Sequence, residues 1–332
     1  MKENLQNRYD FSEIISALEK SEYPLIVGHL SPDEDAAGSA LALSMALKQL
    51  GKEPMVVFED DLPSYLDFLP QQSTILKPEA IDEKRDLMVM VDCASPKRIG
   101  KEWSLPLVDK LPVIAIDHHA TTDGFECTNL TDSKAAANSQ IIYYLLNALC
   151  CEITLDIATC LFAGISGDTG GFRYSNTNRE TMEIGGMLMD MGVDTQLIRT
   201  RLFESRPMKD LSMMGVAMLN MHQSADKLLV WTSVSLAEKA KYNATEINCE
   251  NISSYTMFPE GVKVGVFFQE MPEGIIKMSM RSRDGYDVAR VAQIFGGGGH
   301  KVAAGCRTRG TLEEIMDKVL AAMKEMIADC NK

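Results

Sequence analysis

Residues 23–35 read YPLIVGHLSPDED, and this stretch decides the fold class. Its first part is a short continuous apolar run, which is typical of a strand buried on both faces. The run ends at His29, and a helical pattern extends from about Ala36 to Leu50. A buried strand that leads directly into a helix indicates the beginning of a parallel α/β sheet.

The same alternation continues through the first part of the chain. Further strands are predicted at 54–58, 87–92 and 112–117, and helices at 135–149, 155–166 and 179–191. Repeated strand and helix patterns of this kind predict βαβ units. We therefore expect an α/β fold in which residues 1–195 form a domain with a mainly parallel sheet.

The remainder of the chain predicts a linker and a second domain. Residues 196–224 are helical in pattern and rich in methionine, and we interpret them as a helical linker whose methionines pack in a core. Residues 225–332 then return to an α/β pattern, with strands at 227–233, 262–269 and 275–280 and helices at 287–295 and 312–328. This predicts a smaller C-terminal α/β domain.

Composition limits the classes of function. The chain has 332 residues, of which 45% are hydrophobic and 24% charged, as in globular proteins. A net charge of −14 argues against long duplex nucleic acid as the main partner, because such binding needs a broad basic surface. No apolar run approaches the ~20 residues that span a bilayer, and no signal-peptide pattern is present. We expect a cytoplasmic protein with no membrane partner and a short, phosphorylated ligand.

Residues suited to metal binding follow the predicted strands. His29, Asp92 and Asp117 each end an apolar run. Ligands of parallel α/β sheets bind beyond the carboxyl ends of the strands, so these side chains are expected at one edge of the sheet. Asp33 and Asp35 follow in the first loop, although an aspartate there could also simply cap a helix.

Two more segments extend this pattern. Residues 117–119 read DHH, and residues 164–174 read GISGDTGGFRY, with Asp168 at the end of a predicted helix. Mixed carboxylate and imidazole ligands suit Mn²⁺, Mg²⁺ or iron, and the eight cysteines contain no C-x-x-C pair typical of structural zinc. We predict two divalent cations. Mn²⁺ is the expected ion, and Mg²⁺ or another divalent ion is the alternative. A single ion, or unrelated surface loops, are the alternatives.

The four acidic and histidine segments resemble motifs I to IV of the DHH phosphoesterase family, which is named after the sequence of residues 117–119. Residues 296–305, GGGGHKVAAG, resemble the signature of the DHH-associated C-terminal domain, and Arg281-Ser282 matches a substrate-facing pair of that domain. The resemblance runs through nearly the whole chain in the expected order. It implies a catalytic N-terminal domain and a substrate-binding C-terminal domain.

The resemblance also implies a role for each residue. One metal would be bound by His29, Asp33 and Asp92, and the other by Asp35, Asp92, His118 and Asp168, with Asp92 bridging. His119 would contact the scissile phosphate and act in catalysis with Asp92, and Asp117 would orient an imidazole. The substrate-binding set would be Arg281, Arg283, Gly298, Gly299, His300 and His119.

The C-terminal segment has a physical interpretation of its own. A glycine-rich turn that opens a short helix would present backbone N–H groups to an anion, and residues 296–305 are read in this way. The segment lacks the ending of a nucleoside-triphosphate loop. Arg281 and Arg283 lie two apart at a strand end, where both can hold a terminal phosphate. Either could instead be an ordinary surface charge, and for Arg283 the two interpretations are equally weighted.

Within the family, a single two-domain chain is similar to the bacterial nanoRNases. This implies hydrolysis of short oligoribonucleotides to mononucleotides, and removal of the 3′-phosphate from phosphoadenosine phosphate. One alternative is a phosphodiesterase for cyclic di-AMP or a linear dinucleotide. Another is a non-catalytic nucleotide sensor, which should have lost metal ligands that this chain keeps. The sequence is also compatible with a homodimer.

Overall fold

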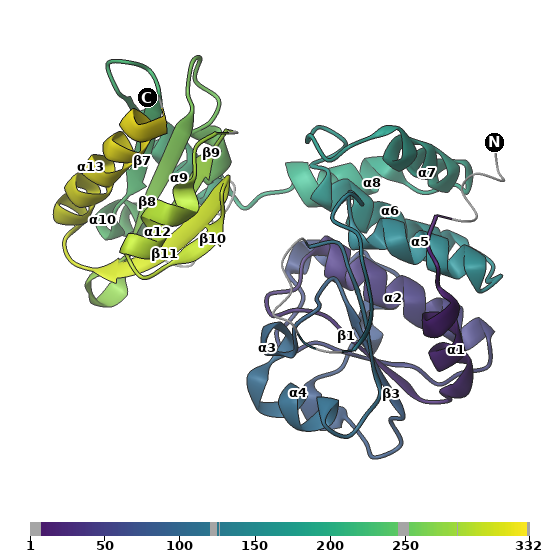
Figure 1. The fold of residues 1–332 in the computed structure, drawn as a ribbon. Coiled ribbons are helices and arrows are strands. Elements are labelled where there is room, and N and C mark those ends of the chain that lie inside the picture. Colours follow the sequence, from purple (N-terminus) through teal and green to yellow (C-terminus); the bar gives the residue numbers. More distant parts are fainter. Residues whose placement is uncertain (1–7, 120–124, 126, 245–251, 284, 331–332) are drawn as a thin grey trace. The chain divides into compact units, whose positions relative to one another are not determined.

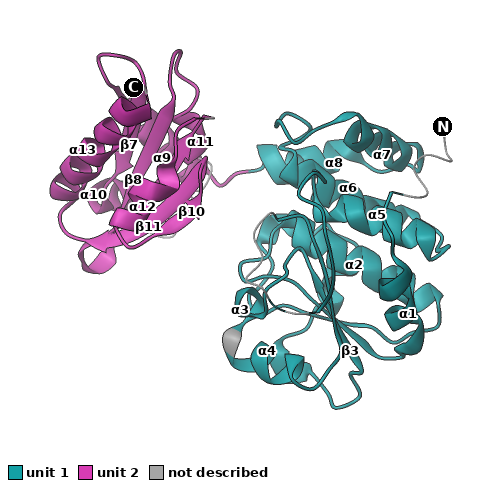
Figure 2. Ribbon diagram, in the orientation of Figure 1, with its two compact units in different colours: residues 1–205 teal, residues 206–332 magenta. Residues whose placement is uncertain are grey.

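The computed structural model describes residues 8–119, 125, 127–244, 252–283 and 285–330. The chain divides into two compact units, residues 1–205 and 206–332 (Figure 2). The division lies within residues 196–224, the segment that the sequence predicts as a helical linker. No helix in the described ranges is both long enough and apolar enough to span a membrane.

The first unit is built around a five-stranded sheet in the order β2-β1-β3-β4-β5. Two of its strands, β1 and β3, are labelled in Figure 1. Every strand pair in it is parallel, which confirms the predicted fold class. The strands are β1 (Pro24–Val27), β2 (Met55–Val57), β3 (Leu87–Val91), β4 (Val113–Asp117) and β5 (Thr128–Thr131). The edge strand β5 was not predicted, because it is short and its polar residues are not fully buried.

Helices cover both faces of this sheet. The helices described in the first unit are α1 (Ser12–Lys20), α2 (Glu34–Gln49), α3 (Pro96–Ile99), α4 (Lys101–Val108), α5 (Asn138–Ala148), α6 (Leu155–Asp168), α7 (Arg179–Asp190) and α8 (Thr195–Arg199), and a π-helical turn spans Thr200–Glu204. Ile26 and Val89 face a core shared with α2, α5 and α6, whereas Leu25 and Met88 face a core shared with α3 and α4. Burial on both faces explains why the central strands are continuous apolar runs.

Helices α2 and α6 pack closely because glycines stand at their contact. A Cβ atom on Gly38 would lie 2.4 Å from the backbone oxygen of Cys160. A Cβ atom on Gly164 would lie 2.1 Å from Ser139 Oγ and 2.7 Å from Asp35 Oδ1. Larger residues would therefore separate the helices, and the first turn of α2 would move with them.

The second unit contains a six-stranded sheet in the order β10-β11-β9-β8-β7-β6. Only β7 and β8 are parallel. The strands are β6 (His222–Gln223), β7 (Leu229–Val234), β8 (Val264–Met271), β9 (Ile275–Ser282), β10 (Gly298–His300) and β11 (Ala303–Arg309). The helices are α9 (Met208–Leu219), α10 (Leu236–Lys241), α11 (Ile252–Tyr255), α12 (Val288–Ile294) and α13 (Leu312–Cys330). A second α/β domain is thus confirmed.

One local prediction in this unit is wrong. Residues 296–305 do not open a helix; they form a β-hairpin in which His300 pairs with Ala303. Gly299 has a φ of +140°, and a Cβ atom there would lie 2.6 Å from both Ala303 O and Ala304 Cα. The glycine is needed for close approach of two strands, a requirement that the sequence does not distinguish from a phosphate-binding turn.

We predict that Gly38→Ala lowers the free energy of unfolding by about 1–3 kcal/mol, because the added methyl group overpacks the contact between α2 and α6. Chemical denaturation of the full chain measures this. The matched control is Gly186→Ala in α7, where a Cβ atom would meet nothing within 4 Å. That substitution should raise stability by up to about 1 kcal/mol, since alanine favours helix. Equal effects of the two changes would contradict the proposed close packing.

Candidate metal centre

The predicted ligands come together at the carboxyl edge of the parallel sheet. His29 lies beyond the end of β1, Asp92 follows β3, and Asp117 is the last residue of β4. His118 follows β4, and two helices supply the rest, since Asp33 and Asp35 stand at the beginning of α2 and Asp168 ends α6. Two groups of three side chains have ligand atoms within 4.8 Å of one another: His29, Asp33 and Asp92 form one, and Asp35, His118 and Asp168 form the other.

In the first group, the imidazole of His29 faces two carboxylates. Its Nε2 lies 3.3 Å from Asp92 Oδ2 and 3.6 Å from Asp33 Oδ2. Its Nδ1 lies 2.8 Å from Leu30 O, so this nitrogen donates to the backbone, and Nε2 is the nitrogen that would bind a metal once it has lost its proton. The other oxygen of Asp33 accepts from the backbone N–H groups of Asp35 and Ala36. Asp33 therefore caps α2 and faces His29 at the same time.

In the second group, His118 plays the corresponding part. Its Nε2 lies 3.0 Å from Asp168 Oδ2 and 3.8 Å from Asp35 Oδ2. Its Nδ1 is 3.4 Å from the backbone oxygen of Ala135. A histidine bound to the backbone by one nitrogen has the other nitrogen free and fixed in direction, which is the usual arrangement of a metal-ligating imidazole.

Asp92 lies between the two groups. Its Oδ2 is 3.3 Å from His29 Nε2, and its Oδ1 is 3.3 Å from His118 Nε2. The residue has a φ of +56°, a left-handed conformation that costs on the order of 1 kcal/mol for a side chain with a Cβ atom. Oδ1 is buried and makes no hydrogen bond with any residue that the structure describes. A buried carboxylate with one oxygen toward each group has the arrangement required of a bridging ligand.

Asp35 is held by the beginning of α5. Its Oδ2 accepts from Asn138 N at 2.5 Å, and its Oδ1 accepts from Ser139 N at 2.8 Å. The free N–H groups of a helix start stabilise a negative charge, so this buried carboxylate is oriented by backbone groups, with a longer bond of 3.5 Å from Ser39 Oγ. Neither Asn138 nor Ser139 was predicted from the sequence, and no residue-type signal could have found them, because every non-proline residue carries an N–H group.

His119 is oriented by Asp117 rather than by a backbone group. Asp117 Oδ1 accepts from His119 Nδ1 at 2.7 Å and from His119 N at 3.1 Å. Nδ1 of His119 is therefore engaged with Asp117, and Nε2 is the nitrogen that points to other partners. Asp92, His118 and His119 also lie within ligand distance of one another. Because Nδ1 of His119 already donates to Asp117, we do not count this third group as a separate metal site.

The charges of the centre favour a bound cation. Burial lowers the pKa of His29, but hydrogen bonds to Asp33 and Asp92 outweigh it and raise the pKa to about 10. Burial likewise lowers the pKa of His118, but the facing carboxylates of Asp168 and Asp92 raise the pKa to about 12. Burial raises the pKa of Asp35, and the charges of Asp92 and Asp168 raise it further. Crowded carboxylates of this kind need compensating positive charge, so the residues present fit divalent cations.

Apart from His119, the predicted substrate-binding residues lie in the second unit. Arg281 is on β9 opposite Ala303 of β11, and its Nη1 donates to Met280 O. Arg283 donates from Nε to Val262 O at 3.0 Å and from Nη2 to Met257 O at 3.2 Å. Through these hydrogen bonds the guanidinium holds the loop that contains Met257 and Val262, directly before β8. Gly298, Gly299 and His300 form the exposed strand β10.

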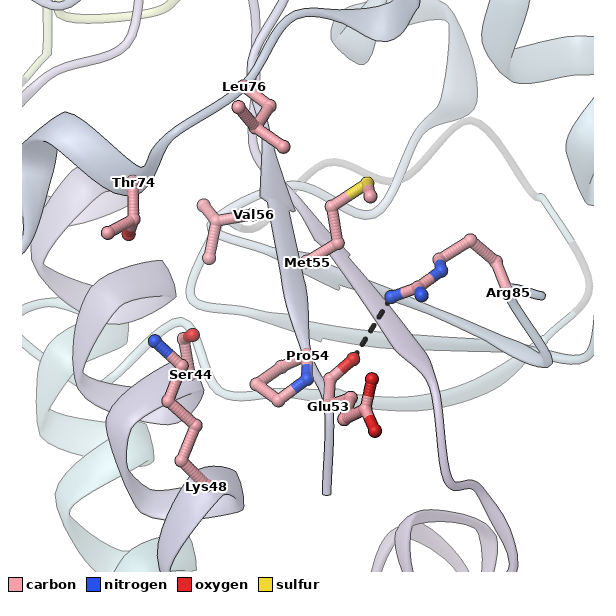
Figure 3. Close-up of a pocket in the computed structure, with 9 residues that line it drawn as sticks. All are labelled: Ser44, Lys48, Glu53, Pro54, Met55, Val56, Thr74, Leu76 and Arg85. Carbon is pink, nitrogen blue, oxygen red and sulfur yellow. Dashed lines mark hydrogen bonds between the residues drawn. The ribbon is translucent and has the colours of Figure 1, made fainter. Parts of the chain in front are cut away.

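Two pockets of the first unit lie away from the centre. One, of about 200 Å³, is lined by the C-terminal part of α2 and the start of β2, where Arg85 donates to Glu53 O (Figure 3). The other, of about 600 Å³, is lined by α1 and by Leu87, Pro112 and Thr128. These three positions stand at the amino ends of β3, β4 and β5. Neither pocket contains a candidate ligand.

Comparisons with known proteins identify the family. Residues 24–165 match the model of the DHH family, N-terminal domain, and residues 231–329 match the DHHA1 domain. This chain belongs to the DHH family. It is a hydrolase that acts on phosphate esters, as the sequence resemblance implied.

Two relatives of this DHH protein align with it over nearly the full length of both chains. The bifunctional oligoribonuclease and PAP phosphatase NrnA of Thermus thermophilus is 34% identical over 315 residues, which are 95% of this chain and 92% of that protein. The crystal structure of an exopolyphosphatase-related protein from Bacteroides fragilis matches with a TM-score of 0.90 at 26% identity, covering 97% of both chains. The cyclic-di-AMP phosphodiesterase GdpP of Geobacillus thermodenitrificans is 26% identical, but the match covers only 44% of that protein.

We predict that Mn²⁺ raises the melting temperature of the wild-type chain and that Asp168→Asn reduces this increase. At a hundredfold excess over Kd, a ligand that binds only the folded state adds about 2.7 kcal/mol of stability. Differential scanning fluorimetry with and without Mn²⁺ measures the shift. The control Asp61→Asn removes an exposed carboxylate outside the centre and should leave the shift unchanged. An equal Mn²⁺ shift in both variants would exclude Asp168 as a ligand.

Proposed function

We propose that this DHH protein hydrolyses short oligoribonucleotides to mononucleotides and also removes the 3′-phosphate from 3′-phosphoadenosine 5′-phosphate. The similarity to NrnA supports this, because it extends over almost the full length of both proteins. The observation that carries the proposal is the position of Asp92, with one carboxylate oxygen toward each ligand group. Two-metal phosphoesterases need such a shared carboxylate to hold their cations close together.

The proposal assigns each ligand group to one cation. His29, Asp33 and Asp92 would hold the first cation, and Asp35, Asp92, His118 and Asp168 the second. Mn²⁺ is the proposed ion and Mg²⁺ the second choice, since carboxylates and imidazoles suit both better than a thiolate-preferring metal. When bound, such cations lower the pKa of a water molecule and offset negative charge on phosphoryl oxygens.

The remaining residues act on the substrate. Because Asp117 holds the Nδ1 proton of His119, the Nε2 atom of His119 is the proposed contact with the scissile phosphate. Arg281, Gly298, Gly299 and His300 are proposed to bind the far end of the substrate. We propose that Arg283 contributes through the loop that its guanidinium braces, since its Nε and Nη2 atoms are engaged there.

Two alternatives have weaker support. A cyclic di-AMP phosphodiesterase is less favoured, because the matching relative shares less than half of its own length with this chain. A non-catalytic nucleotide sensor is less favoured because all six candidate ligands are present, and each group of three lies within ligand distance. Short RNA and phosphorylated mononucleotides are accordingly the proposed substrates.

We expect the wild-type chain with Mn²⁺ to degrade the shortest members of a series of 5′-labelled RNAs from dinucleotide to decamer, and to hydrolyse phosphoadenosine phosphate. Asp92→Ala should lower kcat/KM on the order of 10³-fold, the effect of losing a main electrostatic stabiliser. Product analysis by chromatography measures both. Turnover of cyclic di-AMP alone would assign the protein to second-messenger hydrolysis, and no turnover of any substrate would favour the sensor.

We further expect Asp117→Asn to lower kcat by roughly 10–100-fold, the usual effect of removing a carboxylate that orients a functional histidine. The Mn²⁺-induced increase in melting temperature should persist, because Asp117 belongs to neither ligand group. Steady-state kinetics and fluorimetry on the same preparation test this. Loss of the Mn²⁺ shift would show that Asp117 acts through the metal centre instead of through His119.

A further inference from the structure

A row of cationic side chains lies on one face of the second sheet. In β9, Ile276, Met278 and Met280 are buried in the core that includes α13. Successive side chains of a strand point to opposite faces, so Lys277 and Arg281 lie on the other face. Strand β9 thus carries two cations, four positions apart, away from α13.

Strand β11 continues the row. Its residues Ala304 and Cys306 are buried in the same core, so Arg307 and Arg309 lie on the face opposite α13. Both arginines are exposed, and the neighbouring Lys277 is half-buried. A hydrophobic cluster that contains Met213 of α9 also lies on this face. It includes residues of β7 and β8 and none of β11.

Lys277 and Arg307 stand directly opposite each other in the antiparallel pair of β9 and β11. Side chains so placed have Cβ atoms about 5 Å apart, and like charges there destabilise the sheet. Among the described residues, no ion pair involves Lys277, Arg307 or Arg309. The chain as a whole carries a net charge of −14, so this local concentration of positive charge is unlike the rest of the protein.

The residues between the cations are small. Ser279 of β9 pairs with Gly305 of β11, and this row lies between the Lys277–Arg307 pair and the Arg281–Ala303 pair. Small side chains at these positions leave room for an extended chain along β9. The row offers charge without aromatic rings, so it suits a phosphate backbone and not the stacking of bases.

We propose that Lys277 and Arg307 bind a second backbone phosphate of the oligoribonucleotide, beyond the phosphate held at Arg281. This inference rests on the proposed function. Four residues of strand separate Lys277 from Arg281, a distance of about 14 Å. A stacked single strand advances ~3.4 Å per nucleotide and covers this distance in about four nucleotides. A mononucleotide engages only one of the two positions, so the pair favours the longer of the short substrates.

The first test compares Lys277→Ala/Arg307→Ala with the wild type on phosphoadenosine phosphate, a dinucleotide and a pentanucleotide. We expect KM for the pentanucleotide to rise roughly tenfold, the contribution of one charge-assisted hydrogen bond, with kcat unchanged. Kinetics on the two smaller substrates should not change. The matched control is Lys318→Ala/Lys324→Ala, which removes the same charge from exposed positions of α13.

A second variant distinguishes loss of phosphate binding from loss of folding. Arg307→Glu places a carboxylate opposite Lys277, so it stabilises the strand pair while it removes the anion site. The melting temperature of this variant should equal or exceed that of the wild type. Its KM for the pentanucleotide should nevertheless rise at least as much as that of the double alanine variant.

Binding without turnover provides a separate readout. Fluorescence anisotropy of a 5′-labelled pentanucleotide in EDTA should show weaker binding to both variants. The slope of log K against log salt should become shallower by ~0.7, the change expected when a protein neutralises one phosphate fewer on a single strand. Unchanged pentanucleotide binding and KM would overturn the proposal, as would an equal loss on every substrate. Absence of wild-type turnover would instead contradict the proposed function, and the anisotropy would still decide whether Lys277 and Arg307 bind RNA.

Discussion

The constraint on which this structure depends is the burial of several carboxylates at one edge of a parallel sheet. Asp35 and Asp92 are buried, and Asp33 and Asp168 lie within ligand distance of the same histidines. Negative charges this close together, and away from water, require protons or cations. The backbone N–H groups of α5 stabilise Asp35, but Oδ1 of Asp92 has no hydrogen bond within the described part of the chain. The fold therefore holds a site whose charge balance is completed by a bound cation.

The surrounding architecture follows from that constraint. Parallel strands bring His29, Asp92 and Asp117 to one edge, because their carboxyl ends coincide. Glycines at the contact of α2 and α6 let the first turn of α2 approach α5 and α6, which brings Asp35 to the N–H groups that hold it. The left-handed backbone of Asp92 is a local cost that directs its two oxygens toward different histidines. The close packing of α2 and the left-handed backbone of Asp92 thus both help to position the carboxylates of the metal centre.

The two units differ in how they handle charge. The first concentrates acidic and imidazole groups in a small buried cluster, which suits metal ions. The second presents arginine, lysine and histidine on the antiparallel strands β9, β10 and β11, and such charges suit phosphates. An acidic protein can thereby bind anions without a generally basic surface. Local charge, and not net charge, decides which ligand each unit accepts.

The sequence by itself determined the parallel sheet, the family and the set of candidate ligands, because apolar runs that end in His29, Asp92 or Asp117 are typical of buried parallel strands that lead to a ligand site. It did not reveal β5, whose side chains lack full burial, or α4, which contains Pro106. It also misread residues 296–305, since glycine serves a tight hairpin and an anion-binding turn equally well. Only tertiary structure showed that α5 holds Asp35, that Asp33 caps a helix while facing His29, and that Lys277 opposes Arg307. These depend on backbone N–H direction and strand register, which arise from packing between distant segments and not from the residue types themselves.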